Sequence, residues 1–309
     1  MDRLTENKMI LVVRKTRLEE LAAKYNTVSQ AKFYIEHLGA DFSDYLNEHE
    51  TYCQAVQTVE AALRQLGRLQ TIDRSFLPNF IFGQHDLVIA LGQDGLVVNT
   101  MKYLLGHSLI GVNADPKRWD GVLLPFKANE LARIVPEVFS GKRQIQEVTM
   151  AKAELNNGQN LYGVNDIFIG QKSHVSARYT IKLKDLQEQQ SSSGIIVSTG
   201  LGSTGWLKSI HAGALAVGNP KTTNIRAALP SPWDAKRLYF TVREPFPSKN
   251  TSTSIVCGEI SNQTPLSLTS QMSENGVIFS DGMEADCLEF NSSIVATLRI
   301  AEKKGLLVL

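Results

Sequence analysis

The stretch IALGQDGLVVNT, residues 89–100, joins an apolar run to a helical pattern and decides the fold of the N-terminal half. The largely apolar run DLVIAL, 86–91, predicts a buried strand, and the residues after the glycines predict a helix. In open α/β sheets, ligands bind outside the carboxyl ends of strands, where such turns lie. The turn either binds a phosphate and holds Asp94 for chemistry, or it is a tight turn in which Asp94 caps the helix.

The rest of the chain divides into two halves with different patterns. Residues 9–140 alternate apolar runs with helical periodicity, with strands expected at 9–13, 86–91 and 108–113 and helices at 51–69 and 129–141. From about residue 145, short apolar runs follow one another between Gly, Asn, Ser and Pro, interrupted by one helical pattern at 205–217.

We therefore predict a Rossmann-like α/β nucleotide-binding domain over residues 1–144 and an antiparallel, β-sandwich-like all-β domain over 145–309. This division allows the last strand or strands of the chain to pair within the N-terminal domain. The polar segment DLQEQQSSSG, 185–194, is interpreted as an exposed hairpin loop or a short flexible segment.

Composition narrows the function classes. The net charge of +1 provides no field that would recruit nucleic acid or an anionic membrane, and no apolar stretch approaches the roughly 20 residues that span a bilayer. The N-terminus lacks a secretory pattern. Three scattered cysteines, Cys53, Cys257 and Cys287, suggest neither a disulfide framework nor a zinc site. We predict a cytoplasmic protein with no dedicated metal site and no nucleic-acid or membrane partner.

Two further segments combine polar groups with apolar strands. The stretch STGLGSTGW, 198–206, follows an apolar strand and precedes a helical pattern, so it is either a loop that wraps a polar ligand or a flexible surface loop. Asn165 and Asp166 interrupt the apolar run LYGVNDIFIG and either face a ligand cleft or form an edge-strand bulge.

The order and spacing of these three elements resemble the NAD kinase family, whose members transfer the γ-phosphate of ATP to the 2′-hydroxyl of the adenosine ribose of NAD. The family's Gly-Gly-Asp-Gly motif is matched by Gly92-Gln93-Asp94-Gly95, and its Asn-Glu motif by Asn165-Asp166. Its Ser/Thr-rich motif is matched by Gly202-Ser203-Thr204-Gly205-Trp206, and its late Asp-Gly turn by Asp281-Gly282. Segments 12–21, 110–125, 165–179 and 192–206 look most like the mitochondrial-type branch and its bacterial relatives.

The resemblance implies a fold, an activity and a set of site residues. It implies an α/β domain, an all-β domain, a cleft between them, and a homodimer or higher homo-oligomer. NAD(H) and ATP would be the substrates, and Mg²⁺ would arrive with ATP. Asp94 would be the catalytic base that polarises the ribose hydroxyl. The nucleotide-binding residues would be Gly92, Gln93, Gly95, Asn165, Asp166, Thr199, Gly202, Ser203, Thr204, Gly205 and Trp206.

The chain departs from the family pattern at four positions. Gln93 replaces the second glycine, Leu96 replaces a threonine or serine, Asp166 replaces glutamate, and Ser193 replaces an aspartate. These departures leave three functions open: an NAD kinase with altered phosphate contacts, a kinase of the same superfamily that acts on a sugar or lipid hydroxyl, and a non-catalytic nucleotide-binding regulator. The candidates for cations facing the triphosphate are Lys102, Arg178, Lys208 and Arg237.

Overall fold

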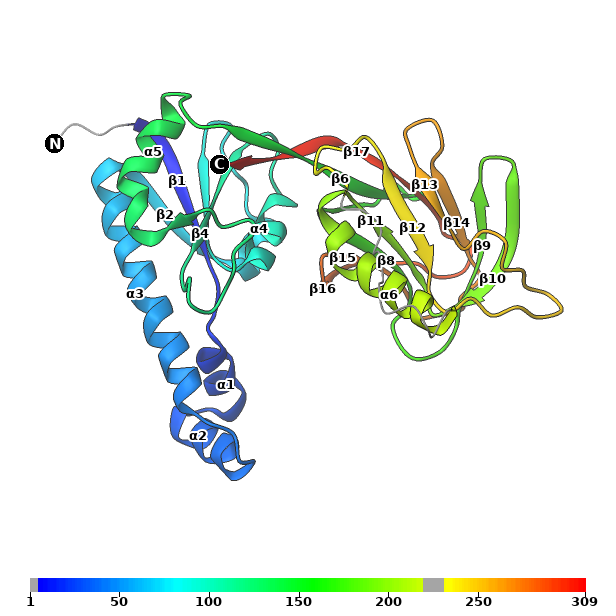
Figure 1. The fold of residues 1–309 in the computed structure, drawn as a ribbon, viewed down its shortest axis with the longest axis horizontal. Coiled ribbons are helices and arrows are strands. Elements are labelled where there is room, and N and C mark those ends of the chain that lie inside the picture. Colours follow the sequence, from blue (N-terminus) through cyan, green and yellow to red (C-terminus); the bar gives the residue numbers. More distant parts are fainter. Residues whose placement is uncertain (1–4, 219–230) are drawn as a thin grey trace. The chain divides into compact units, whose positions relative to one another are not determined.

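The computed structural model describes residues 5–218 and 231–309. The chain forms two compact units: unit 1 comprises Met1–Gln146 with Leu306–Leu309, and unit 2 comprises Glu147–Gly305. Both units appear as ribbons in Figure 1. No helix among the described residues is both long and apolar enough to cross a membrane.

Unit 1 is built on a parallel sheet whose strands pair in the order β17-β4-β3-β1-β2, with the short β5 also paired to β4. The strands are β1 (Thr5–Val13), β2 (Gly67–Asp73), β3 (Leu87–Gly92), β4 (Ser108–Asn113), β5 (Phe126–Lys127) and the end of β17 (Val295–Val308). Every residue of β3 is buried, so helices and loops cover both faces of the sheet at its centre. The α/β architecture predicted for this half is confirmed.

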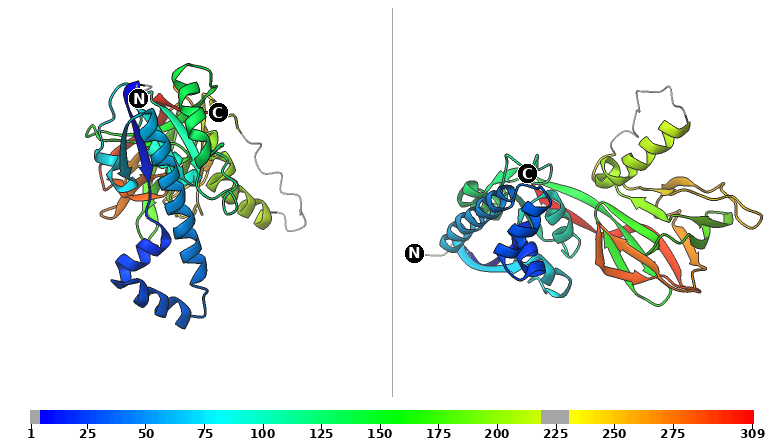
Figure 2. Two further views of the ribbon diagram at one scale, coloured as in Figure 1. Left: turned by 90° about the vertical axis from the view of Figure 1, so that its left-hand side faces the viewer. Right: turned by 90° about the horizontal axis from the view of Figure 1, so that it is seen from below.

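The helices of unit 1 pack on this sheet and on one another. They are α1 (Arg17–Tyr25), α2 (Val28–His37), α3 (Ser43–Leu66), α4 (Asp94–Met101) and α5 (Leu131–Phe139), with short 3-10 turns η1 (Arg74–Asn79) and η2 (Ala128–Glu130). Tyr52, Val59 and Leu63 of α3 pack with alternate residues of β1 and β3 in one core. The α1 and α2 helices stack beside the N-terminal part of α3 (Figure 2) and share a small core of Leu18, Ala31 and Phe42.

Unit 2 contains two sheets with a shared apolar core, which confirms the predicted sandwich-like β architecture. One sheet contains β6 (Ile145–Leu155), β7 (Asn160–Gly163), β9 (Ala177–Leu183), β10 (Leu186–Ser192), β14 (Leu266–Ser270) and most of β17. The second has the order β13 (Cys257–Ile260), β12 (Leu238–Val242), β11 (Ile195–Ser198), β8 (Asp166–Gln171), β15 (Gly276–Ser280) and β16 (Met283–Glu289). Leu268 and Leu298 of the first sheet pack in the same core as Ile169 and Phe240 of the second. The helix α6 (Trp206–Gly218) follows β11 after the 3-10 turn η3 (Leu201–Thr204).

Two local interpretations of the sequence are wrong. Residues 186–192 of the presumed loop form β10, an edge strand that pairs with β9 across a turn containing Lys184. An edge strand tolerates polar residues, and here the buried Gln190 donates to the carbonyl of Ile255 and accepts from the Tyr179 hydroxyl. The helix expected at 51–69 starts earlier and ends at Leu66, because the chain enters β2 at Gly67.

The close approach of β4 to the loop after it generates a stability prediction. A Cβ added to Gly111 would lie 1.9 Å from the carbonyl oxygen of Leu123, whereas one added to Gly213 on α6 would meet nothing within 4 Å. We expect Gly111→Ala to destabilise the protein by about 3 kcal/mol or more, because two backbone segments must separate. Gly213→Ala, the control, should be neutral or slightly stabilising. Thermal unfolding of the two variants measures the difference, and equal melting temperatures would contradict the packing described for unit 1.

Candidate functional site

The GQDG turn of unit 1 connects β3 to the N-terminus of α4. Gln93 is the N-cap residue with φ −124°, an extended conformation that any residue adopts, so its replacement of glycine does not strain the turn. A Cβ at Gly95 would meet nothing within 4 Å, so space is open beside the backbone there. Leu96 is buried, and its Cδ2 would lie 3.2 Å from a Cβ at Gly92, so the side chain packs beneath the turn. The first N–H groups of a helix have no intrahelical acceptor, which makes this end of α4 suited to an anion.

The Asp94 carboxylate holds the turn against the loop that follows β4. It accepts hydrogen bonds from the backbone N–H groups of Leu123, at 2.8 Å, and Val122, at 3.3 Å. Asp94 is the first residue of α4 and Gln93 is the N-cap, so the interpretation in which Asp94 caps the helix is wrong. An ionised carboxylate has about four acceptor sites, which leaves acceptor capacity for a ligand hydroxyl.

An arginine that sequence reasoning did not select lies beside this turn. Arg14 follows β1, which pairs in parallel with β3, and its Nε lies 3.8 Å from the position of a Cβ on Gly92. The hydroxyl of Tyr52 accepts from the Arg14 N–H and donates to the carbonyl of Leu91, both at 2.9 Å. Burial raises the pKa of Tyr52 to about 12, so the hydroxyl keeps the proton that it donates. Tyr52 thus links the carboxyl ends of β1 and β3.

Arg14 belongs to a group that we call the arginine cluster: Arg14, Arg17 and Arg118 with Asp44 and Glu48. Arg14 bonds Glu48 at 2.9 Å, Arg17 bonds both carboxylates, and Arg118 bonds Asp44. Burial alone would raise the pKa of Glu48, but hydrogen bonds from Arg17 and Arg14 hold it below its usual value. Arg118 and Arg17 hold the pKa of Asp44 well below its usual range. Arg118 also pairs with Asp115 at 3.6 Å, so each arginine of the cluster faces at least one carboxylate.

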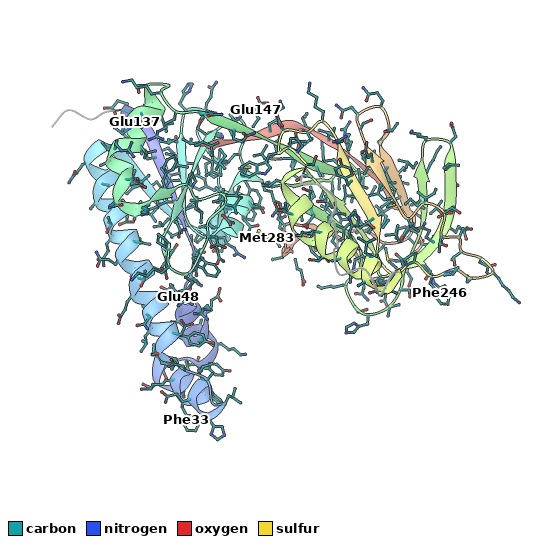
Figure 3. All side chains as sticks on the ribbon, viewed as in Figure 1. Phe33, Glu48, Glu137, Glu147, Phe246 and Met283 are labelled. Carbon is teal, nitrogen blue, oxygen red and sulfur yellow. The ribbon has the colours of Figure 1, made fainter. Side chains whose placement is uncertain are left out.

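Glu48 lies on α3, close to α1, where these charges meet (Figure 3). The side chain of Arg14 is 11% exposed, so water screens its charge only weakly. Arg14 and Arg17 lie in the segment 12–21, which stood out in the sequence only for its likeness to the mitochondrial-type branch. Their ion-pair partners Asp44 and Glu48 lie on α3, and Arg118, after β4, joins them through Asp44; this long-range pairing has no sequence signal.

In unit 2, Asn165 and Asp166 lie at the turn between β7 and β8, which breaks the chain into two strands and is not a bulge. The carboxylate of Asp281 accepts from the N–H groups of Val164, Asn165 and Asp166, the shortest being 2.7 Å to Asn165. Asp281 itself has φ 55° in the turn between β15 and β16. The late Asp-Gly turn therefore holds the Asn165–Asp166 turn in place.

The hydroxyl-rich loop packs directly on the same turn. Thr199 donates from its backbone N–H to the carbonyl of Asn165 at 2.9 Å and from its hydroxyl to the carbonyl of Val164 at 2.6 Å. A Cβ on Gly202 would lie 2.0 Å from the carbonyl oxygen of Asn165, so only glycine fits. Ser203 is buried and donates to the carbonyl of Gly200. The loop is packed and not a flexible surface loop.

The predicted nucleotide-binding residues of unit 2 therefore divide into two groups. The hydroxyls of Thr199 and Ser203 are used within the loop, whereas Thr204 and Gly205 are exposed and Trp206 is half-buried at the start of α6. The structure gathers Asn165, Asp166, Thr199, Gly202, Ser203 and Asp281 into one cluster within unit 2. Gly92, Gln93, Asp94 and Gly95 form the separate turn of unit 1.

Of the basic candidates from the sequence, Lys102 is in unit 1, and Arg178, Lys208 and Arg237 are in unit 2. Lys102 follows the last turn of α4, about 12 Å along the helix axis from Asp94, and its ammonium lies over the ring of Tyr103. Arg237 pairs with Glu259 before β12, and Arg178 lies on β9. Lys208 is exposed on α6. Within unit 1, the guanidinium of Arg14 lies beside the GQDG turn.

Asp166 is a buried carboxyl whose protonation couples to folding. Burial, reinforced by the Asp281 carboxylate, raises its pKa to about 7. An unfolded aspartate titrates near pH 4, so between about pH 4 and pH 7 the folded protein keeps a proton that the unfolded chain has lost. The free energy of unfolding therefore falls as the pH rises through this window, and it levels off above it.

We expect Asp166→Asn to remove this part of the pH dependence, because an amide does not titrate. The free energy of unfolding of the variant minus that of the wild type should therefore be larger at about pH 8 than at about pH 5. Asp185→Asn, at the exposed turn before β10, is the matched control. Urea unfolding across this pH range is the measurement. Wild-type and Asp166→Asn curves that stay parallel would show that Asp166 does not titrate in this window.

Comparison with known proteins gives partial sequence matches and nearly complete fold matches. No protein-family model matches the chain. The chain is 29% identical over 129 residues to the NAD kinase of Clostridium kluyveri, which covers 39% of this chain and 44% of that protein. It is 32% identical over 133 residues to the NAD kinase of Prosthecochloris aestuarii, which covers 41% and 45%. These alignments thus span less than half of the relatives' length.

Two solved structures share the fold over almost the whole chain. An NAD kinase from Archaeoglobus fulgidus in complex with ATP has a TM-score of 0.60 at 13% identity, covering 98% of this chain and 93% of that one. Yeast NADH kinase complexed with NADH has a TM-score of 0.59 at 15% identity, covering 98% and 84%. The chain thus has the fold of these two kinases, and part of its sequence is similar to that of curated NAD kinases.

Proposed function

We propose that this chain is an ATP-dependent NAD kinase that phosphorylates the 2′-hydroxyl of the adenosine ribose of NAD(H) to give NADP(H). The observation that carries the proposal is the Asp94 carboxylate, fixed at the open N-terminus of α4 by two backbone N–H groups and accompanied by the arginine cluster. The kinase relatives that match this chain in sequence and in fold support the same activity.

Phosphoryl transfer depends mainly on positioning and charge neutralisation, and it asks few side chains to do covalent chemistry. In the proposed reaction, the ribose 2′-oxygen attacks the γ-phosphorus of ATP, the bond to the β–γ bridging oxygen breaks, and ADP leaves. Asp94 accepts a hydrogen bond from the attacking hydroxyl and orients it. The N–H groups at the start of α4 and the Arg14 guanidinium would face the phosphates.

Unit 2 would supply contacts to the sugar and base. Asn165 and Asp166 would meet ribose and adenine, and Thr204 and Gly205, exposed on the loop that packs against that turn, would make further contacts. Within residues 5–218 and 231–309, no group of three or more His, Cys, Asp or Glu side chains is arranged to hold a metal ion. In this proposal Mg²⁺ arrives with the ATP substrate, whose phosphate oxygens are its usual ligands.

Asp94→Asn tests the proposed base directly. We expect NADP formation from NAD, ATP and Mg²⁺ to fall by at least about a hundredfold, because an amide cannot take up the hydroxyl proton. The fold should persist, since the side-chain oxygen of asparagine still accepts from the Leu123 N–H. Asp120→Asn, in the same loop region and exposed, is the control. An assay coupled to an NADP-specific dehydrogenase measures the rate.

The same assay separates the alternatives. Wild-type rates in Asp94→Asn would end the assignment of Asp94. A wild type that binds NAD in calorimetry but forms no NADP would instead be a nucleotide-binding regulator. A wild type that phosphorylates a sugar or a lipid in place of NAD would be a kinase of the same superfamily with another acceptor.

Arg14→Gln tests the proposed phosphate contact. Hydrogen bonds to charged groups contribute about 1.5–3 kcal/mol, so the KM for ATP should rise on the order of tenfold to a hundredfold. The KM for NAD should change little. Arg64→Gln removes an exposed arginine paired with Glu60 on α3 and serves as the control. Equal increases of both KM values would indicate a general loss of structure and not a phosphate contact.

A further inference from the structure

The loop between β4 and β5, residues 114–125, is fastened to α3 at its middle as well as to Asp94 near its end. The guanidinium of Arg118 donates to both oxygens of the Asp44 carboxylate, with 3.2 Å between Nη1 and Oδ2. Pairing through two hydrogen bonds fixes the direction of a guanidinium as well as its distance from the carboxylate. Asp44 lies in the first turn of α3, so this ion pair joins the loop to the helix.

Asp44 is itself held by a third element. Arg17, at the start of α1, bonds Asp44 at 2.6 Å and also bonds Glu48, whose side chain is only 4% exposed. The Arg17 guanidinium lies over the ring of Tyr45, 4.6 Å from its centroid. Figure 1 shows α1 beside the N-terminal part of α3. Asp44 therefore meets Arg118 as part of a fixed arrangement of α1 and α3.

The part of the loop around Arg118 is a closed turn. The backbone N–H groups of Arg118 and Trp119 both donate to the carbonyl of Asp115 at 3.1 Å. The Asn113 side chain closes the turn, because it accepts from the Asp115 N–H and donates to the Trp119 carbonyl, both at 3.0 Å. Asn113 is buried and is the last residue of β4, so this turn is anchored on the sheet.

The next turn carries the two N–H groups from which Asp94 accepts. The N–H of Leu124 donates to the carbonyl of Gly121 at 3.1 Å, and both donors lie between these two residues. Gly121 has φ 69°, and a Cβ there would lie 2.7 Å from the Asn113 amide nitrogen, so this turn packs directly on the first. A movement of the first turn is therefore passed on to the donors of Asp94.

We propose that Asp44 and Arg118 are positioning residues for Asp94. Their ion pair fixes the loop between β4 and β5, and the loop presents the N–H groups of Val122 and Leu123 that orient the Asp94 carboxylate. Both side chains act through the backbone of the loop and touch no substrate. The effect on catalysis rests on the proposed function, whereas the coupling between α3 and the loop does not.

Hydrogen exchange of the Leu123 amide, followed by NMR, tests the coupling without an activity assay. This N–H donates to Asp94 at 2.8 Å and belongs to a buried residue, so it exchanges when the loop opens. We expect Arg118→Gln to accelerate this exchange about tenfold, because the loop loses its bond to α3. The amide of Ile89, at the centre of β3, should exchange at the wild-type rate.

Two further variants make this measurement specific. Arg133→Gln removes an exposed arginine of α5 and should leave the exchange of Leu123 unchanged. Asp44→Asn removes the same ion pair from its other side, so adding Arg118→Gln to it should accelerate the exchange no further. Unchanged exchange of Leu123 in Arg118→Gln would overturn the proposal. So would equal acceleration at Leu123 and Ile89, or effects of the two substitutions that add.

The rate of NADP formation tests the catalytic role. We expect Arg118→Gln to lower kcat about tenfold and to change the KM values for ATP and NAD by less than about twofold, because a misplaced base slows the chemical step and leaves the binding contacts in place. In the Asp94→Asn background, the same substitution should lower the residual rate no further. An unchanged kcat in Arg118→Gln, or a further fall in the Asp94→Asn background, would overturn the catalytic role.

The two measurements keep a failure of the positioning role apart from a failure of the proposed function. If the wild type forms no NADP, the proposed function fails, and the exchange of Leu123 decides whether Asp44 and Arg118 fix the loop. If the wild type forms NADP but Leu123 exchanges at the wild-type rate in Arg118→Gln, the proposed function stands and the positioning role is wrong.

Discussion

A buried or half-buried carboxylate that accepts backbone N–H groups holds each of the two polar sites in shape. In unit 1, Asp94 accepts from Val122 and Leu123 and so ties the start of α4 to the loop after β4. In unit 2, Asp281 accepts from three successive N–H groups at the Asn165–Asp166 turn. Without these acceptors, backbone donors would lose their partners in regions with little access to water. The geometry of the turns therefore depends on charged side chains from distant segments.

Close backbone contacts allow these turns to form. Gly202 lets the hydroxyl-rich loop approach the carbonyl of Asn165, and Gly111 lets β4 approach Leu123. The family's Gly-Gly-Asp-Gly motif loses its second glycine here, yet Gln93 adopts an extended conformation without strain. The substitution places a glutamine side chain beside the turn, and the backbone of the turn can still adopt its conformation. In the proposed function, Gln93 and the buried Leu96 would therefore act through their contacts with the nucleotide phosphates, and not through a distorted loop.

Elements with a clear pattern of buried apolar side chains could be predicted from the sequence. Elements that are held by contacts with distant segments could not. The fully apolar β3 and the stripe of Tyr52, Val59 and Leu63 on α3 predicted the α/β core, because these side chains can only be buried in this way. The helices α1 and α2 were missed because their shared core of Leu18, Ala31 and Phe42 is small and closes against α3. The strand β10 was missed because its polar residues find their partners on β9 and near Ile255.

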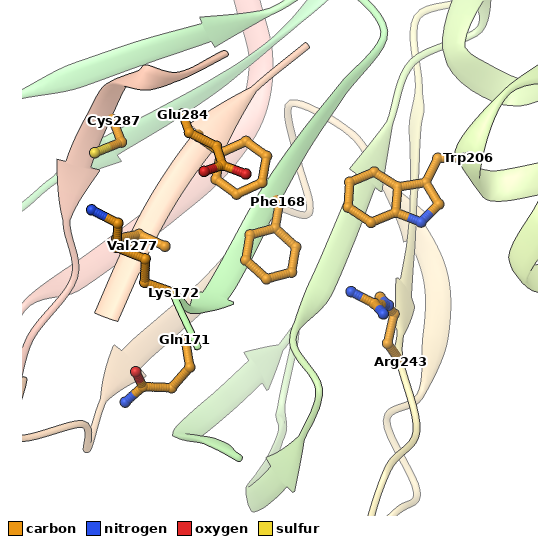
Figure 4. Close-up of a pocket in the computed structure, with 9 residues that line it drawn as sticks. Phe168, Gln171, Lys172, Trp206, Arg243, Val277, Glu284 and Cys287 are labelled. Atoms are coloured by element: carbon orange, nitrogen blue, oxygen red, sulfur yellow. The ribbon is translucent and has the colours of Figure 1, made fainter. Parts of the chain in front are cut away.

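In the candidate site, too, some features could be predicted from the sequence and others could not. The sequence predicted that Asp94 and the loop at 198–206 follow strands, and in the structure they follow β3 and β11. Asn165 and Asp166, expected to interrupt one strand, lie instead at the turn between β7 and β8. The arginine cluster could not be predicted, because Arg14, Glu48 and Arg118 are far apart in sequence and meet only in the folded unit. The pocket that Figure 4 shows near Trp206 likewise combines β8, β15 and α6 with the segment after β12.

The central claim is that these sites serve phosphoryl transfer from ATP to a ribose hydroxyl of NAD. Phosphorus-31 NMR of the purified protein with NAD, ATP and Mg²⁺ tests it most directly, because it observes donor, acceptor and product together. The account predicts a new phosphomonoester resonance of a ribose 2′-phosphate that grows in equal amount with ADP. ADP accompanied only by inorganic phosphate, or spectra that do not change with time, would contradict it.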